Sequence, residues 1–188
     1  MPQQRRRSGI IIGLVAHGLL TGVALTASPA QAVDAVGPYY AEPAWDRKLP
    51  AATRFVVLTN WNSDAVLDKE TGLVWERSPT VATSIWAQAR LACTARTTGN
   101  RLGWRLPSVH ELASLGVPLV LPQTGPTLPP GHPFVNVQRA DYWSATTDAE
   151  GSTVAWVVDF DDGLVDHFNK TFGFQVWCVR GGNNADAY

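Results

Sequence analysis

Cysteine and methionine are scarce in this chain of 188 residues, which contains two cysteines and one methionine. Neither Cys93 nor Cys178 has a second thiol close to it in the sequence, so the paired cysteine spacings of zinc sites and redox motifs are absent. Two cysteines in an exported chain favour a single structural disulfide. A catalytic or metal-binding role for the two thiols is the alternative.

Long hydrophobic runs are also few. The apolar run Ile10–Leu25 has about sixteen residues, which is short of the roughly 20 that a membrane-spanning helix needs. It follows the basic segment Arg5–Arg7 and precedes the small-residue cleavage signature at residues 30–32. We therefore interpret residues 1–32 as a secretory signal peptide, with an uncleaved anchor helix as the alternative. We expect a secreted or periplasmic protein with no stable membrane anchor after cleavage.

Basic residues are too few and too scattered for a polyanion-binding protein. The chain has 15 Lys plus Arg against 16 Asp plus Glu, and cleavage of the leader would remove three arginines and no acid. The mature chain would then carry a net charge of about −4. Nucleic acid affinity depends on clustered Lys and Arg that release counterions. We therefore expect no nucleic acid partner.

Tryptophan, by contrast, is abundant, with eight residues in the chain. The 156 residues that follow the leader suit one folded domain. Because a large aromatic side chain buries roughly 150–250 Å², part of the tryptophan set must form the core. Any tryptophan left exposed is a candidate for stacking against a ligand.

The chain after the leader divides into three parts. Residues 33–53 are rich in proline and alanine and predict an extended lead-in, residues 54–182 predict the folded domain, and residues 183–188 a short tail. The β-branched segment Arg54–Thr59 predicts a strand. Residues 65–76 predict two further strands around a turn.

Two short helices are expected in the middle of the domain. Apolar residues recur at three- and four-residue steps up to Cys93, which predicts a helix with Ser84 or Thr83 as its N-cap and Cys93 on its buried face. Further on, Ser108 and Glu111 have capping-box spacing, which predicts a second helix that stops near residue 116. Six prolines between residues 117 and 133 then predict a long surface loop.

The C-terminal part contains four alternating apolar runs separated by glycine turns, at residues 142–147, 153–160, 164–168 and 174–180. Strict alternation predicts half-buried strands, and the runs together predict a compact antiparallel β-meander locked by the disulfide. The turn at residues 161–163 is explained by hairpin chemistry. The fold class that follows is α+β, with two short helices and antiparallel sheets.

Five phrases of the sequence occur in a characteristic order, at residues 71–76, 104–112, 142–147, 155–163 and 178–181. Taken together they resemble the Lcl C-terminal domain family, and the similarity covers about residues 54–182. The resemblance implies a fold similar to C-type lectin-like domains and the formylglycine-generating enzyme superfamily. In that architecture a cysteine of the first helix pairs with one of the last strand, which implies a Cys93–Cys178 bond. No Gly-X-Y repeat precedes the domain, so collagen-driven trimerisation is not implied.

Catalytic and metal-binding interpretations find little support in the motifs. Four aspartates, including Asp166, surround one turn and could offer oxygen ligands to calcium, but their spacing differs from an EF-hand loop. Ser144 or Ser108 could stand beside His167 or His110, but no Gly-x-Ser-x-Gly elbow is present. Copper-dependent oxidation of a cysteine would need a free thiol. We therefore predict no catalytic residue, no metal and no cofactor.

The remaining hypothesis is that the domain binds a ligand, because aromatic side chains stack on sugar rings and acidic side chains hydrogen-bond to hydroxyl groups. The two short helices cannot cover both faces of the predicted sheet. The alternative is that the tryptophans fill the core, which we expect at least for Trp156 and Trp177. We predict a non-catalytic domain that binds a glycan or a cell-surface protein, with a structural module of the cell envelope, or a formylglycine-generating-type oxidase, as alternatives. The candidate ligand-binding residues are Trp143, Trp156, Trp177, Asp159, Asp161, Asp162 and His167.

Overall fold

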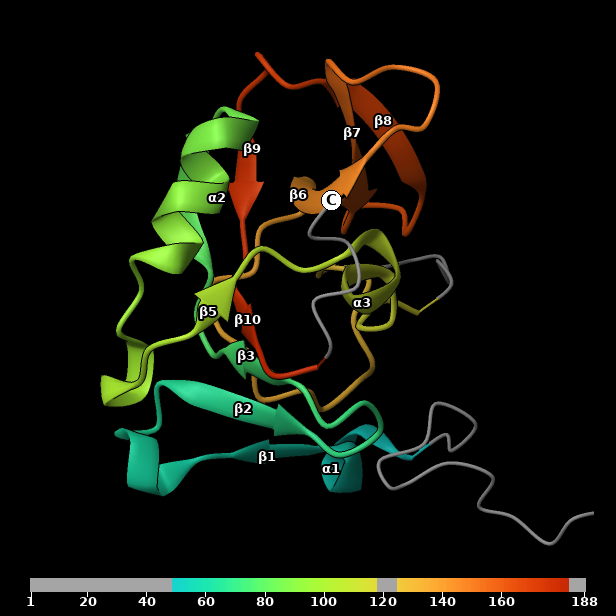
Figure 1. The fold of residues 1–188 in the computed structure, drawn as a ribbon. Helices are drawn as coiled ribbons and strands as arrows, with labels where there is room; N and C mark the ends of the chain where they lie inside the picture. Colours follow the sequence, from blue (N-terminus) through green and yellow to red (C-terminus); the bar gives the residue numbers. More distant parts are fainter. Residues whose placement is uncertain (1–48, 118–124, 183–188) are drawn as a thin grey trace, which may run out of the picture. The chain divides into compact units, whose positions relative to one another are not determined.

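The computed structural model describes residues 49–117 and 125–182, all within one compact unit (Figure 1). The predicted signal peptide, most of the predicted lead-in, the predicted tail and residues 118–124 of the proline-rich loop lie outside the described residues. Within the described part, no helix has the length and apolar character needed to cross a membrane.

The described chain has an α+β fold with two five-stranded sheets and a few short helices. The α-helices are α1 (Ala51–Arg54), α2 (Trp86–Thr94) and α3 (Val109–Ala113), and the 3-10 helices are η1 (Thr59–Trp61) and η2 (Thr98–Asn100). The strands are β1 (Phe55–Val57), β2 (Ala65–Asp68), β3 (Val74–Glu76), β4 (Thr80–Ser84), β5 (Trp104–Arg105), β6 (Asp141–Thr147), β7 (Val154–Asp159), β8 (Val165–Asn169), β9 (Phe174–Val176) and β10 (Val179–Arg180).

The first sheet has the strand order β1-β2-β3-β10-β5 and is antiparallel throughout. The predicted pair of strands within residues 65–76 is confirmed as the β2–β3 hairpin, and the preceding strand is β1. Residues 51–53, which belong to the predicted extended lead-in, are instead part of the helical turn α1. This turn is held because buried Arg54 donates to both carboxylate oxygens of Asp68, at 2.9 and 2.7 Å.

The second sheet has the order β4-β9-β6-β7-β8. The predicted meander is confirmed for β6, β7 and β8, which pair in sequence. It is wrong for the fourth run, because β9 pairs with β4 and, in parallel, with β6. The same run then continues as β10 in the first sheet, so the last apolar segment joins the two sheets (Figure 1).

Both predicted helices are present, but only the second has the predicted cap. In α3 the hydroxyl of Ser108 accepts from the N–H of Glu111 at 3.2 Å, and the Glu111 carboxylate accepts from the N–H of Ser108 at 2.8 Å. The N-cap of α2 is Ile85, without a side-chain cap bond. The predicted N-caps were wrong because Thr83 and Ser84 belong to β4, a strand that pairs with β9 far along the sequence.

The described end of the proline-rich loop is packed into the domain. Thr127 and Leu128 are buried, and the N–H of Thr127 donates to the carbonyl of Phe160 at 2.9 Å. The carbonyl of Thr127 accepts from the N–H of Val117 at 2.9 Å. The prediction of a surface loop is therefore wrong for these residues, because their backbone groups bond to the main fold.

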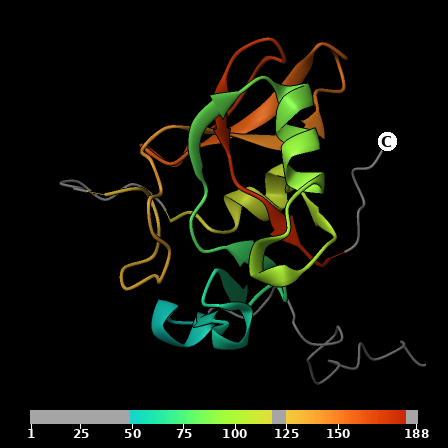
Figure 2. The same ribbon diagram turned by 90° about the vertical axis from the view of Figure 1, so that its left-hand side faces the viewer.

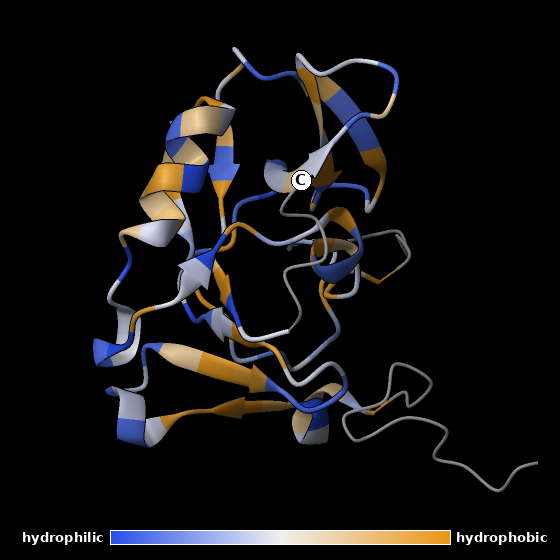
Figure 3. Ribbon diagram, in the orientation of Figure 1, coloured by the Kyte–Doolittle hydropathy of each residue, from blue (hydrophilic) through white to orange (hydrophobic). Residues whose placement is uncertain are grey.

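Helices α2 and α3 pack on opposite faces of the second sheet. Figures 1 and 2 show α2 running beside β9. Neighbouring residues of β7 point to opposite faces, so Val157 joins the core under α2 and Val158 joins the core under α3. Edge strand β8 is mostly exposed, and Figure 3 shows hydrophilic and hydrophobic residues along it. The expectation that two short helices cannot cover both faces of the sheet is therefore wrong for its central strands, because one helix packs on each face, and the exposed part is edge strand β8.

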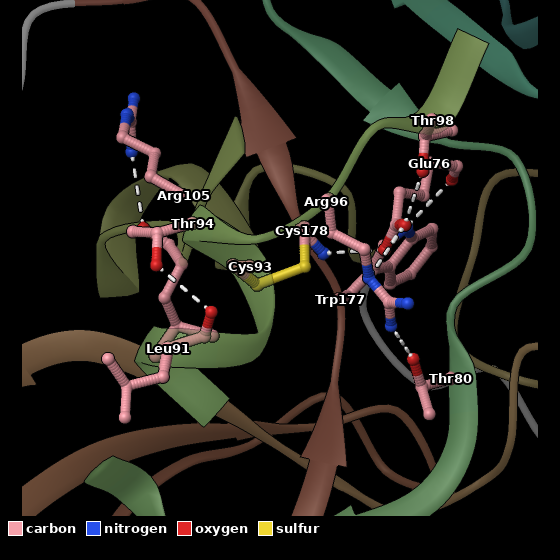
Figure 4. Close-up of a disulfide and its surroundings, with 11 residues drawn as sticks. Glu76, Thr80, Leu91, Cys93, Thr94, Arg96, Thr98, Arg105, Trp177 and Cys178 are labelled. Atoms are coloured by element: carbon pink, nitrogen blue, oxygen red, sulfur yellow. Dashed lines mark hydrogen bonds and ion pairs between the residues drawn. A yellow bond between two sulfur atoms is a disulfide. The ribbon is translucent and has the colours of Figure 1, made fainter. Parts of the chain in front are cut away.

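A disulfide between Cys93 of α2 and Cys178 closes the fold, with Cα atoms 5.4 Å apart (Figure 4). Cys178 stands between β9 and β10, where the chain passes from one sheet to the other. Its N–H donates to the carboxylate of buried Glu76 at 3.2 Å, and Thr98 donates to the same carboxylate at 2.9 Å. Arg96 Nε lies 3.2 Å from that carboxylate, within ion-pair distance although the N–H is not aligned with it as a hydrogen bond.

Removal of this disulfide by the double substitution Cys93→Ser and Cys178→Ser should lower the free energy of unfolding substantially. The bond closes a loop with a sequence separation of 85 residues, and the chain-entropy model gives about 4–5 kcal/mol for such a loop. Urea unfolding of the mature chain, followed by tryptophan fluorescence, measures the difference. A loss below about 1 kcal/mol would show that the sheets hold together without the bond.

Candidate functional site

Two of the three candidate tryptophans lie in the core. The exposed fraction of Trp143 and of Trp177 is 0%, and their indole N–H groups donate to the carbonyls of Ser84 and Glu76, both at 2.8 Å. Neither ring has a face available for a ligand. The prediction that they bind a ligand is therefore wrong, whereas the expected core position of Trp177 is confirmed.

Trp156, which was also expected in the core, is only partly buried against it and lies beside exposed His167 on the neighbouring strand β8. The two rings meet edge to face with centroids 5.0 Å apart. Nδ1 of His167 lies 2.9 Å from the carboxylate of Asp148. The backbone pairing of β7 and β8 thus brings two of the sequence-predicted residues together on one face of the sheet.

The serine nucleophiles that the sequence offered have other roles. Ser144 is buried, and its hydroxyl donates to the backbone carbonyl of Trp156 at 2.7 Å. Ser108 caps α3. Both hydroxyl groups therefore serve the fold, and the arrangement does not support nucleophilic catalysis.

The three candidate aspartates lie where β7 connects to β8, with Asp159 as the last residue of β7 and Asp161 and Asp162 in the turn. Asp159 accepts from the N–H of Asp161 at 2.7 Å, and Asp162 accepts from the N–H of Leu164 at 2.9 Å. Gly163 has a φ of 81°, which a glycine adopts without strain. The interpretation of Asp161 and Asp162 as turn residues is confirmed. Within residues 49–117 and 125–182, no three His, Cys, Asp or Glu side chains gather as a potential metal site.

An acid that the sequence analysis did not single out lies next to this turn. Asp141 stands directly opposite Asp159 in the β6–β7 register. Burial, and to a smaller extent the nearby carboxylates of Asp159, Asp166 and Asp162, together raise the pKa of Asp141 to about 6. Burial also raises the pKa of Asp159. The only signal in the sequence was the position of Asp141 at the start of an apolar run.

A largely apolar cleft of 680 Å³ opens between the end of α3 and the β7–β8 turn. Leu164, which lines the cleft, and Val165, which follows it in the chain, have exposed fractions of 64% and 44%. The cleft is lined by Ala113, Gly116, Val117, Val158, Asp162, Gly163 and Leu164.

The cleft and the Trp156–His167 pair belong to one surface. Val158 and Trp156 are two residues apart on β7, so their side chains point to the same face of the sheet. Val165 and His167 are their partners on β8. We call this surface the hairpin face and define it by Trp156, Val158, Asp162, Leu164, Val165 and His167.

The structure thus defines a class of protein, a disulfide-bonded α+β domain with an open apolar surface at the edge of one sheet. The sequence profile of the Lcl C-terminal domain matches residues 64–180, and the chain belongs to this family. The match includes both cysteines and the whole hairpin face. A search of curated proteins found no match.

The substitution Asp141→Asn should stabilise the fold in a pH-dependent manner. The pKa of this carboxyl is about 6 in the folded chain against an ordinary 3.8, so ionised Asp141 destabilises the fold and stability is lost as the pH rises from about 4 through about 6. Because the side chain is partly solvated, we expect a gain of only about 1 kcal/mol at about pH 8 and little change at about pH 4. Urea unfolding at the two pH values measures both quantities.

Glu150→Gln is the matched control, since it removes an exposed carboxylate from the adjoining β6–β7 connection. It should leave stability nearly constant at both pH values. An equal effect of Asp141→Asn at both pH values would contradict the argument from burial and like charge.

Proposed function

We propose that this protein is a non-catalytic recognition domain of C-type lectin-like architecture that acts outside the cytoplasm, secreted or in the periplasm. A bond between α2 and the segment that follows β9 supports this architecture, because the resemblance described above implies a helix-to-strand disulfide. A structural disulfide also suits an oxidising compartment.

The observation that carries the proposal is the hairpin face. Exposed aliphatic side chains at Leu164 and Val165 border an apolar cleft. Contiguous exposed apolar surface beside a concave site is characteristic of interaction sites, where anchoring side chains of a partner fill a pocket. Strand β8 lies at the edge of its sheet, so a partner can reach this surface without rearrangement of the domain.

The chemistry of the cleft favours a protein ligand over a glycan. Its walls are mostly aliphatic and suit an apolar side chain of the partner. Trp156 packs against the core and meets the His167 ring, which leaves little of its face for stacking on a sugar. The turn carries several aspartates, of which only Asp161 pairs with an arginine among the described residues, Arg139. A partner with an apolar anchor and basic flanks is therefore complementary.

The oxidase alternative lacks its reactive group, since both cysteines of the chain are joined in the disulfide. A structural module of the envelope remains the rival to recognition. The two differ in whether the hairpin face captures a specific partner.

The substitution Leu164→Asp should weaken partner capture at least about tenfold, because it places a charge at the mouth of the apolar cleft. The measurement is a pull-down of surface proteins by the immobilised mature chain, run beside a glycan array, each with and without EDTA. We expect a protein to be retained, independently of EDTA.

The control is Leu91→Asp, which changes an equally exposed leucine, 68% against 64%, on α2. It should leave capture unchanged, and thermal unfolding should show both variants folded. Retention of glycans alone would redirect the proposal to sugar binding, and silence in both assays would favour the structural module.

A further inference from the structure

A second cleft of different chemistry lies away from the hairpin face. It has a volume of 350 Å³ and opens where the end of β3 meets the turn after η1, the helix η2 and the segment around Val135. Its walls carry charges of both signs, from Asp64, Glu76 and Arg77, together with the hydroxyl groups of Ser63, Ser78 and Thr98.

Two opposite charges line this cleft without neutralising each other. Among the described residues, the guanidinium of Arg77 donates only to backbone carbonyls, those of Pro133 at 3.2 Å and Ser63 at 3.4 Å. Asp64 is exposed. In the part of the chain that the structure describes, neither side chain has an ion-pair partner. The two residues are nevertheless fixed side by side, because the N–H of Arg77 donates to the carbonyl of Asp64 at 2.8 Å.

The third charged residue of the cleft, Glu76, already has partners within the fold. The carboxylate of Glu76 accepts from Thr98 and from the N–H of Cys178 and lies beside Arg96. With an exposed fraction of 4%, Glu76 forms a fixed wall next to the disulfide (Figure 4). The charges open to a ligand are therefore those of Arg77 and Asp64.

Several residues at the rim of the cleft have a left-handed backbone conformation. Among the described residues, four that are not glycine have a positive φ, namely Asn62 (56°), Ser63 (60°), Asn100 (57°) and Asn136 (57°). Every one of them lines the cleft or lies within two residues of a lining residue. Asparagine adopts this conformation more readily than other residues that have a side chain. Left-handed residues other than glycine cluster at ligand-binding sites.

Contacts around the rim keep it in place. The amide of Asn136 donates to the hydroxyl of Ser78 at 3.1 Å. A side chain at Gly99 would come within 2.8 Å of Trp61, which shows how closely η2 approaches η1. A preformed rim lowers the entropy lost when a ligand binds.

We propose that this cleft binds a small zwitterion, a free α-amino acid, with its carboxylate at Arg77 and its ammonium group at Asp64. Both contacts are charge-assisted hydrogen bonds, which are about twice as strong as neutral ones. A polyanion would be repelled by Asp64, and a neutral sugar could form hydrogen bonds with Arg77 and Asp64 but would neutralise neither charge. The volume lies at the lower end of the about 300–1,000 Å³ of ligand pockets, which suits a molecule of this size. The site is independent of the hairpin face.

Isothermal titration of the mature chain with L-alanine, L-leucine, L-glutamate and L-lysine tests this site. L-Alaninamide, which lacks the carboxylate, and N-acetyl-L-alanine, which lacks the ammonium group, should each bind at least about tenfold more weakly than L-alanine. Glucose should not bind. Absence of binding by every amino acid, or equal binding of L-alanine and its two single-charge analogues, would overturn the proposal.

Two variants test which residue binds the carboxylate of the ligand and which binds its ammonium group. Asp64→Asn should weaken L-alanine binding about tenfold without weakening the binding of N-acetyl-L-alanine, which lacks the ammonium group. Arg77→Gln should weaken L-alanine binding about tenfold without weakening the binding of L-alaninamide, which lacks the carboxylate. Arg101→Gln, at an exposed arginine outside the cleft lining, should change nothing. Arg77 also supports the fold through its two carbonyl contacts. If that variant does not fold, Asp64→Asn alone decides, and unchanged binding by Asp64→Asn counts against the site.

Discussion

The disulfide between Cys93 and Cys178 anchors the segment that connects the two sheets, and the arrangement of the sheets depends on this segment. Here the last apolar run leaves the second sheet and enters the first. Trp177, the residue before Cys178, packs against the rings of Trp75, Phe134, Tyr142 and Phe160. The disulfide therefore ties α2 to the residue next to the centre of the aromatic core, and the buried Glu76 carboxylate binds the same backbone.

Both proposed binding surfaces lie where loops leave this fixed scaffold. The apolar cleft lies between the end of α3 and the β7–β8 turn, and the polar cleft lies beside the end of β3, next to Glu76. Loops on a rigid scaffold are the usual position of binding sites, because their side chains are free to vary while the strands keep them in place. The two clefts differ in chemistry, one aliphatic with an acidic turn and one with opposite charges.

The tryptophans show why residue type alone did not locate the site. Trp143 and Trp156 belong to neighbouring strands with the same alternating pattern, yet Trp143 is fully buried and Trp156 reaches the surface. The difference arises because α2 and β4 cover the face on which Trp143 lies, whereas the face of Trp156 is open beside edge strand β8. Likewise, the raised pKa of Asp141 and the position of Arg77 in the polar cleft depend on residues in distant segments of the chain.

The sequence by itself determined the features whose interactions are local. The capping box of Ser108 and Glu111, the β2–β3 hairpin and the β7–β8 turn involve residues only a few positions apart, so their patterns predicted them correctly. Only the tertiary structure decided the division of residues 174–180 between two sheets, the presence of β4 and the burial of Thr127. These features depend on hydrogen bonds between segments far apart in the chain, and no local pattern of residues specifies which distant segment will be the partner.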